Sequence, residues 1–156
     1  MADGINLNGL QEHLDLPFPA NTKQVSGDVN GVRTDVMSFK FSDKIMVTIS
    51  QNGRLGHWLH VPLETKNPGT EGLHTIPDSE DDSLLPLSDL TATSVLGGRA
   101  PGHEVVGQLY ARQIASAIVT KSPHENRTLV VGLGLETVEA DRDVFFAVID
   151  LVLQCI

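Results

Sequence analysis

Histidine, cysteine and serine are the residues of this 156-residue chain that could bind metals or act as nucleophiles. His57 and His60 are the closest histidine pair, but a spacing of three along a strand directs their side chains to opposite faces, which prevents them from readily sharing one ion. The other histidines, His13, His74, His103 and His124, complete no recognisable ligand set. The single cysteine, Cys155, has no nucleophile context, and no serine lies in a Gly-x-Ser-x-Gly turn. We therefore predict no catalytic, cofactor-binding or metal residues, and a protein that is not an enzyme.

A short glycine-containing stretch, Gly132-Leu133-Gly134, lies where a dinucleotide-binding loop would stand, at the end of a predicted strand and before a helix. Thr137 occupies the place of the next expected glycine. We interpret the two glycines as positions of close packing or of a strand bulge.

Charge excludes several classes of partner. The chain has 20 acidic and 11 basic residues, a formal net charge of -9, and no cluster of Lys and Arg of the kind that neutralises phosphates. We therefore expect neither nucleic acid nor membrane as a partner. No apolar stretch approaches the ~20 residues that span a bilayer, and the first residues lack the features of a secretory signal. Together with the lone cysteine, this predicts an intracellular protein. We expect it in the cytoplasm, with the nucleus as a second compartment.

The first half of the chain carries the strongest local signals. Asn30-Gly31 and Asn52-Gly53 are Asn-Gly pairs, which tolerate the positive φ that two-residue hairpin turns require, and Ser42-Asp43 supplies a turn between them. They delimit four predicted strands at about Lys23–Val29, Val32–Phe41, Lys44–Gln51 and Gly56–Leu63. We expect these strands to form an antiparallel meander.

The second half predicts strand, helix, strand, helix, at about Thr91–Leu96, His103–Thr120, Thr128–Leu135 and Asp143–Gln154. The apolar run in Thr128–Leu135 suits a central strand, and Gly107, Ala111 and Ala115 give the first helix a side that can approach a sheet closely. The predicted fold class is α+β, an antiparallel sheet meander with two C-terminal helices packed on it in two layers.

The predicted domain organisation is one domain over residues 22–156, preceded by an N-terminal tail over residues 1–21. Residues 64–88 are predicted to form a flexible acidic loop, because they are rich in proline, glycine and acidic residues and lack sustained periodicity. A disordered insertion and an acidic arm that meets a basic partner surface both fit this segment.

The last predicted helix is apolar over an arc of roughly 220°, more than the ≳100° that faces a single core. Its centre, at Phe145, Val148 and Val152, is expected to form the core. A flank remains, and our candidate partner-interface residues are Phe146, Ile149 and Leu153. Coverage by the N-terminal tail and contact with another subunit both explain this flank.

Residues Gln24 to Pro62, with the run of apolar residues into Ser50-Gln51 and the Gly56 that opens the next strand, resemble the opening meander of the proteasome assembly chaperone 3 family. Val105 to Ile156, with the strand TLVVGLGLE and the helix DVFFAVIDLVLQCI, is similar to that family's C-terminal half in order and spacing. The chain resembles the fungal-type members and differs from the shorter ones in its N-terminal tail and acidic loop.

The resemblance implies a non-catalytic chaperone that acts without ATP in assembly of the alpha ring of the 20S core particle. Its implied partners are proteasome assembly chaperone 4, in a heterodimer, or a second copy of itself in a homodimer, and alpha-type proteasome subunits. The alternative is a self-associating intracellular adaptor unrelated to the proteasome.

Overall fold

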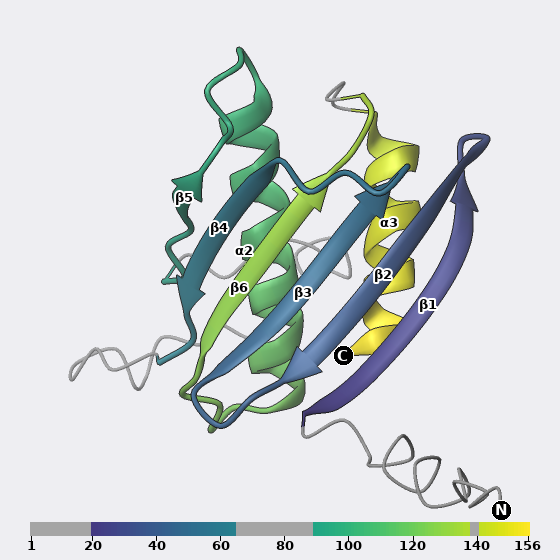
Figure 1. Ribbon diagram of the computed structural model, residues 1–156. Helices are drawn as coiled ribbons and strands as arrows, with labels where there is room; N and C mark the ends of the chain where they lie inside the picture. Colours follow the sequence, from purple (N-terminus) through teal and green to yellow (C-terminus); the bar gives the residue numbers. More distant parts are fainter. Residues whose placement is uncertain (1–19, 65–88, 138–140) are drawn as a thin grey trace, which may run out of the picture.

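Residues 20–64, 89–137 and 141–156 are described by the computed structural model, in which one six-stranded sheet carries two helices on one of its faces (Figure 1). The elements are β1 (Asn21–Val29), β2 (Val32–Lys40), β3 (Lys44–Gln51), β4 (His57–Pro62), β5 (Thr93–Leu96), α2 (His103–Lys121), β6 (Thr128–Gly134) and α3 (Arg142–Cys155). The predicted α+β class, with two C-terminal helices forming a second layer, is confirmed.

The first three strands form the predicted antiparallel meander because their turns are chemically suited to reverse the chain. Asn30 and Gly31 have φ of 52° and 80°, and Val29 pairs with Val32 across the turn that they make. At the next reversal the Phe41 N–H donates to the Lys44 carbonyl over 2.9 Å. The register of β1, β2 and β3 therefore follows from two-residue turns that the sequence identifies.

The fourth strand of the predicted meander is the point at which the structure differs. Asn52 and Gly53 do form the turn, with φ of 52° and 70° and a 3.1 Å hydrogen bond from the Arg54 N–H to the Gln51 carbonyl. The strand order, however, is β1-β2-β3-β6-β4-β5. β6 pairs parallel to β3 and antiparallel to β4, so the sheet is mixed. The antiparallel meander therefore ends at β3, because β6 occupies the position that the sequence predicts for β4.

The connection from β3 to β4 crosses the end of β6 at a very short distance. The Gly56 N–H donates to the Leu133 carbonyl over 3.0 Å, and a Cβ on Gly134 would lie 1.7 Å from the Arg54 carbonyl oxygen. Only glycine fits at position 134. The interpretation of this glycine as a site of close packing is confirmed.

The two helices pack on the same side of the sheet, with their small and apolar residues buried. Ala111 and Ala115 of α2 are fully buried, as their small-residue spacing predicts. Asp141 caps α3, since its side chain accepts from the Asp143 N–H over 2.9 Å. Gly27 of β1 lets Leu151 of α3 lie close, because a Cβ there would be 2.8 Å from that side chain.

The core lies between the helices and one face of the sheet. Residues directly opposite one another on neighbouring strands share a face, and the rows that face the helices are apolar and buried. One such row runs through Val36, Ile49 and Leu133, and a second through Val47, Val131 and Leu59.

Two predicted segments lie outside the described residues. The N-terminal tail is described only at Ala20 and Asn21, where β1 begins two residues earlier than the sequence predicts. The acidic loop is described only at Glu64. Neither helix within the described part of the chain is long and apolar enough to cross a membrane.

Candidate partner interface

The three candidate interface residues of α3 separate into two groups. Phe146 is 37% exposed and Leu153 is 48% exposed, so both present apolar surface to solvent. Ile149 is 7% exposed and belongs to the core, together with Val148 and Val152. The exposed apolar surface of α3 is therefore formed by Phe146 and Leu153, two turns apart, with Ile149 beneath it. Whether a partner contacts these residues stays a prediction.

Phe146 already has neighbours within the chain. The Arg142 guanidinium carbon lies 5.4 Å from the centre of the Phe146 ring. The Phe145 ring packs edge to face against the same ring, with 5.7 Å between the two ring centres. Phe145 in turn contacts Tyr110 of α2 at 4.7 Å, as expected of a residue predicted to face the core. We call Phe146 and Leu153 the α3 flank. Its apolar surface is small, because the Arg142 guanidinium lies over part of the Phe146 ring.

A second surface with apolar side chains lies on the opposite side of the sheet. In the view of Figure 1 the helices lie behind the sheet, so this second face is turned toward the reader. Two rows of opposed residues cross all six strands on it. The first row is Thr22, Phe39, Met46, Val130, His60 and Thr93, and the second is Gln24, Met37, Thr48, Gly132, Trp58 and Leu96. We call these twelve residues the open face.

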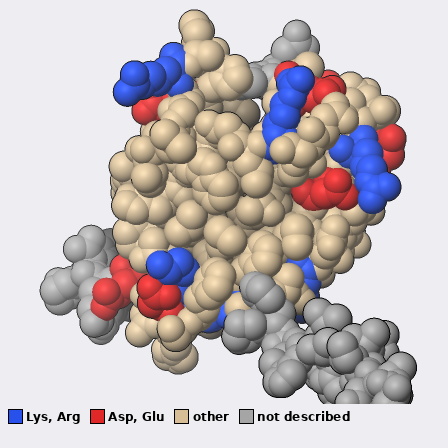
Figure 2. All heavy atoms as spheres, viewed as in Figure 1, with Lys and Arg blue, Asp and Glu red and all other residues tan. Residues whose placement is uncertain are grey.

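The open face contains no Asp, Glu, Lys or Arg in either row, and Figure 2 shows this uncharged area at the centre of the view with charges around it. Five of its larger apolar side chains are half-buried, namely Met37, Phe39, Met46, Trp58 and Val130, and Leu96 at its edge is exposed. Trp58 lies against Gly132, since a Cβ at that position would be 2.8 Å from the indole ring. The glycine therefore lets the indole approach the sheet closely.

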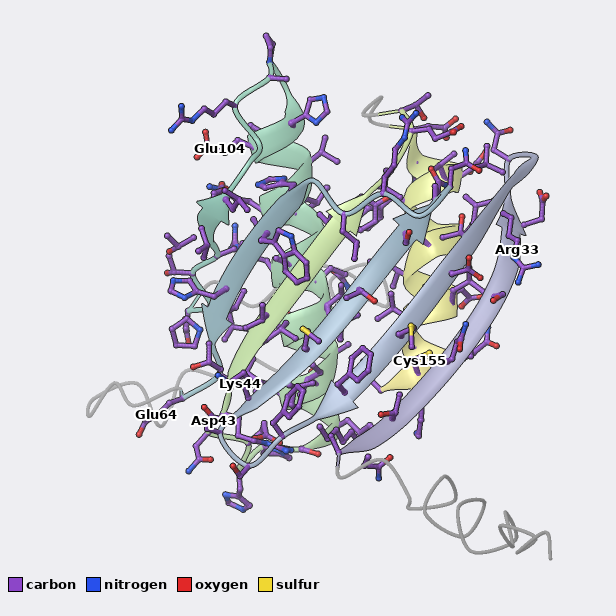
Figure 3. All side chains as sticks on the ribbon, in the orientation of Figure 1. Arg33, Asp43, Lys44, Glu64, Glu104 and Cys155 are labelled. Carbon is purple, nitrogen blue, oxygen red and sulfur yellow. The ribbon has the colours of Figure 1, made fainter. Side chains whose placement is uncertain are left out.

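Charged residues border the open face as neighbouring pairs of opposite sign. Arg33 and Asp35 form an ion pair of 3.3 Å on β2, and Lys44 and Asp43 form one of 3.1 Å where β3 begins. Figure 3 shows Arg33 at one end of the sheet, and Asp43 and Lys44 at the other. A hydrogen bond from Ser26, followed by the contact with Arg33, lowers the pKa of Asp35. An uncharged apolar centre with a polar rim is the anatomy of a protein interface.

The sequence analysis missed the open face, although one signal was available. On β2, Val32 and Val36 lie on one side and Met37 and Phe39 on the other, so both sides of the strand carry apolar residues. A strand that is apolar on both sides is typically covered on both sides.

The sheet separates the two histidines that are closest in the sequence. His57 and His60 lie on opposite faces, as their spacing predicts, with His57 toward the helices and His60 on the open face. The His57 Nε2 lies 2.9 Å from the Ser94 Oγ. Burial is the main cause that lowers the pKa of His57, and His103 adds to the effect.

The His57–Ser94 pair has the spacing of a base and a nucleophile, but its surroundings favour a structural role. Among the described residues no carboxylate hydrogen-bonds the imidazole, and a Cβ on Gly107 would lie 2.5 Å from its Nδ1. A cavity of about 240 Å³ borders the ring, lined also by Arg54, His103 and Leu133. The pair joins β4 to β5 beneath α2.

Comparison with known proteins assigns the chain to a family. The model of the proteasome assembly chaperone 3 family matches residues 47–155, and the chain belongs to that family. The matched range begins within β3 and includes Trp58, Val130, Phe146 and Leu153.

Among solved structures, the chain is similar to one from a chaperone complex for yeast 20S proteasome assembly. The two are 19% identical, with a TM-score of 0.49, over 86% of this chain and 99% of that one. The comparison with curated proteins gives no significant match.

Proposed function

We propose that this chain is an ATP-independent chaperone for assembly of the 20S proteasome alpha ring, acting as a heterodimer with proteasome assembly chaperone 4. The observation that carries the proposal is its membership of the proteasome assembly chaperone 3 family. In this proposal the protein binds alpha-type subunits and catalyses no reaction. We expect it in the cytoplasm and the nucleus, where such assembly would take place.

The surfaces described above support a binding role. Affinity in protein complexes is concentrated in a few buried aromatic and aliphatic side chains, and Phe146 and Trp58 are exposed or half-buried candidates for such anchors. The His57–Ser94 pair lacks a group that orients the imidazole within the described residues. A partner-binding protein explains these features better than an enzyme does.

The proposal is tested by recovering the partners of the full chain. The tagged protein is captured from native extract of its own source, and the bound proteins are identified by mass spectrometry. We expect alpha-type proteasome subunits and proteasome assembly chaperone 4. Recovery of both in amounts no greater than from a tag-only control would overturn the proposal, and a stable self-associated form without alpha-type subunits would favour the unrelated adaptor.

The α3 flank is tested by Phe146→Asp, which places a charge on the exposed ring position. If the flank contacts a partner, a buried uncompensated carboxylate should reduce partner recovery at least about 30-fold, or roughly 2 kcal/mol. Leu109→Asp is the matched control, because Leu109 is a 43% exposed apolar residue on α2. A Phe146→Asp protein that keeps its fold, its oligomeric mass and its partners would exclude the flank as an interface.

A further inference from the structure

The cavity of about 240 Å³ beside His57 lies at the N-terminal end of α2, on the helix side of the sheet. The first turns of α2, the end of β6 and the connection from β3 to β4 surround it (Figure 1). Four glycines bring backbone to its wall, and its other described lining residues are Arg54, His57, His103, Val106, Leu133 and Leu135. We call this space the α2 cavity. Its lining side chains are therefore of two kinds, three that donate hydrogen bonds and three that are aliphatic.

The polar side chains of the α2 cavity suit an anion. Arg54, His57 and His103 can each donate an N–H group, and the described lining residues include no Asp or Glu, although the chain has a net charge of -9. Glu104, the acid in the first turn of α2, lines a separate cavity, and Figure 3 shows it on the β5 side of the helix. The positive end of the α2 dipole lies here as well, and the N-cap residue Gly102 gives it no side-chain hydrogen bond.

His57 is held with one ring nitrogen engaged and the other beside the cavity. The residue is 6% exposed, and its Nε2 lies 2.9 Å from the Ser94 Oγ. A Cβ on Gly107 would lie 2.5 Å from Nδ1, so the glycine leaves this nitrogen uncovered. With the Ser94 hydroxyl donating to Nε2, the proton of the neutral imidazole is on Nδ1, where it can be donated to an anion. A buried donor is thus in place before any ligand binds.

The backbone that carries Arg54 is fixed as well. Its N–H donates to the Gln51 carbonyl over 3.1 Å, and its carbonyl oxygen occupies the space that a Cβ on Gly134 would need. The Arg54 side chain is exposed whereas His57 is buried. The guanidinium is therefore at the mouth of the α2 cavity, and the imidazole is part of its inner wall.

We propose that the α2 cavity binds an aliphatic carboxylate, with the carboxylate against Arg54, His57 and His103 and the aliphatic part against the three apolar side chains. A phosphate could use the same donors, but it would set a wholly charged group against the aliphatic wall. The volume is below the range of about 300–1,000 Å³ that is typical of drug-sized ligands, so a small acid or the last residue of a peptide is the right size. The inference goes beyond the proposed function, because the site is distinct from the open face and from the α3 flank.

The first test compares related ligands on the unmodified chain. Isovalerate is an aliphatic carboxylate, isovaleramide lacks its charge, acetate lacks its branched chain, and inorganic phosphate is a different anion. The backbone amide signals of residues 103–107, followed by NMR, should saturate with isovalerate at a dissociation constant of about 10 mM or below. We expect the other three ligands to bind at least about 10-fold more weakly. No saturation by isovalerate, or equal affinity for isovaleramide, acetate or phosphate, would overturn the proposal.

A further ligand distinguishes the two sources of such a carboxylate. N-acetyl-leucine carries the same branched chain together with a peptide group, so it represents the C-terminus of a protein. Binding tighter than that of isovalerate would support the proposal with a peptide as the source, and weaker but saturable binding would support it with a free acid as the source.

The second test removes the permanent charge at the cavity. Arg54→Gln should raise the dissociation constant for isovalerate at least about 10-fold, because the carboxylate loses a charge-assisted hydrogen bond. Arg33→Gln is the matched control, since it removes the same charge from an exposed position on β2, and it should leave the affinity unchanged. Circular dichroism establishes that both variants fold. A folded Arg54→Gln protein with native affinity would overturn the proposal, and if that variant fails to fold, the ligand comparison on the unmodified chain still decides.

The two proposals fail in different ways. A chain that recovers alpha-type subunits but does not bind isovalerate would refute the carboxylate site and leave the proposed function intact. Saturable isovalerate binding by a chain that recovers no proteasome subunit would do the reverse.

Discussion

Replacing Gly107 by alanine should destabilise the protein, although the same change within most helices is stabilising. Gly107 lies within α2, where alanine is ordinarily favoured over glycine by about 0.5–1 kcal/mol. Here a Cβ would lie 2.3 Å from the His57 Cε1, well inside normal contact distance. His57 cannot easily withdraw, because Ser94 hydrogen-bonds its Nε2 and a Cβ at the Gly98 position would already be 2.4 Å from that atom. Overpacking of this kind costs about 1–3 kcal/mol, which exceeds the gain.

A double-mutant cycle separates the two effects. Urea unfolding followed by far-ultraviolet circular dichroism should show Gly107→Ala to be less stable than the native chain. In the His57→Ala background, where the imidazole is absent, the same change should raise the free energy of unfolding by up to about 1 kcal/mol. Thr120→Ala, at an exposed position of the same helix, is the control and should be stabilising by a few tenths. The reasoning is refuted if Gly107→Ala stabilises the native chain, or if the effects at positions 107 and 57 are additive.

Three further predictions concern titration. Burial raises the pKa of Tyr110 to about 12, so ultraviolet absorbance should show this single tyrosine ionising near pH 12 in the folded chain, and near pH 10 in urea. The Arg127 side chain lowers the pKa of Glu125 from 4.5 to about 2. Its contribution to stability is therefore complete above pH 4.5 and is lost as pH falls toward 2, and Glu125→Gln should reduce this acid dependence. Burial lowers the pKa of His57, so the unfolded chain binds the proton more tightly. Stability should fall as pH drops below about 6.5, and His57→Gln should weaken that fall.

The parts of the fold that the sequence predicts correctly depend on turn chemistry and helix periodicity. Asn30-Gly31 fixes the β1–β2 turn whatever surrounds it, because the requirement for positive φ is local. Gly107, Ala111 and Ala115 likewise identify the side of α2 that faces the sheet, since a small-residue stripe needs only helical spacing. Both signals are independent of long-range contacts.

The burial of Ile149 shows what helical periodicity cannot decide. The angular position of this residue on α3 places it on the flank, but the width of the buried side depends on what lies around the helix. α3 packs on β1 and β2 and also contacts α2, so more of its surface is covered than a single strand pair would cover. Ile149 is therefore part of the core, and only Phe146 and Leu153 remain exposed on the flank.

The position of β4 explains why the open face escaped prediction. If β4 had followed the Asn52-Gly53 turn as the second strand of a hairpin, the pairing of Gln51 with Arg54 would have set Trp58 opposite Val47. Val47 faces the helices, and Trp58 would have joined it in the core. Instead β6 lies between the two strands, and Trp58 pairs with Gly132, which is opposite Thr48.

A shift by one residue exchanges the two faces of a strand. The connection through Arg54, Leu55 and Gly56 therefore has two effects, since it crosses the width of β6 and also shifts the register of β4. By changing the register it places Leu59 in the core and the indole on the open face. The one tryptophan of the chain thus lies on the open face because β6, from the C-terminal half of the chain, pairs between β3 and β4. A local turn signal cannot predict this pairing, because it depends on residues far apart in the sequence.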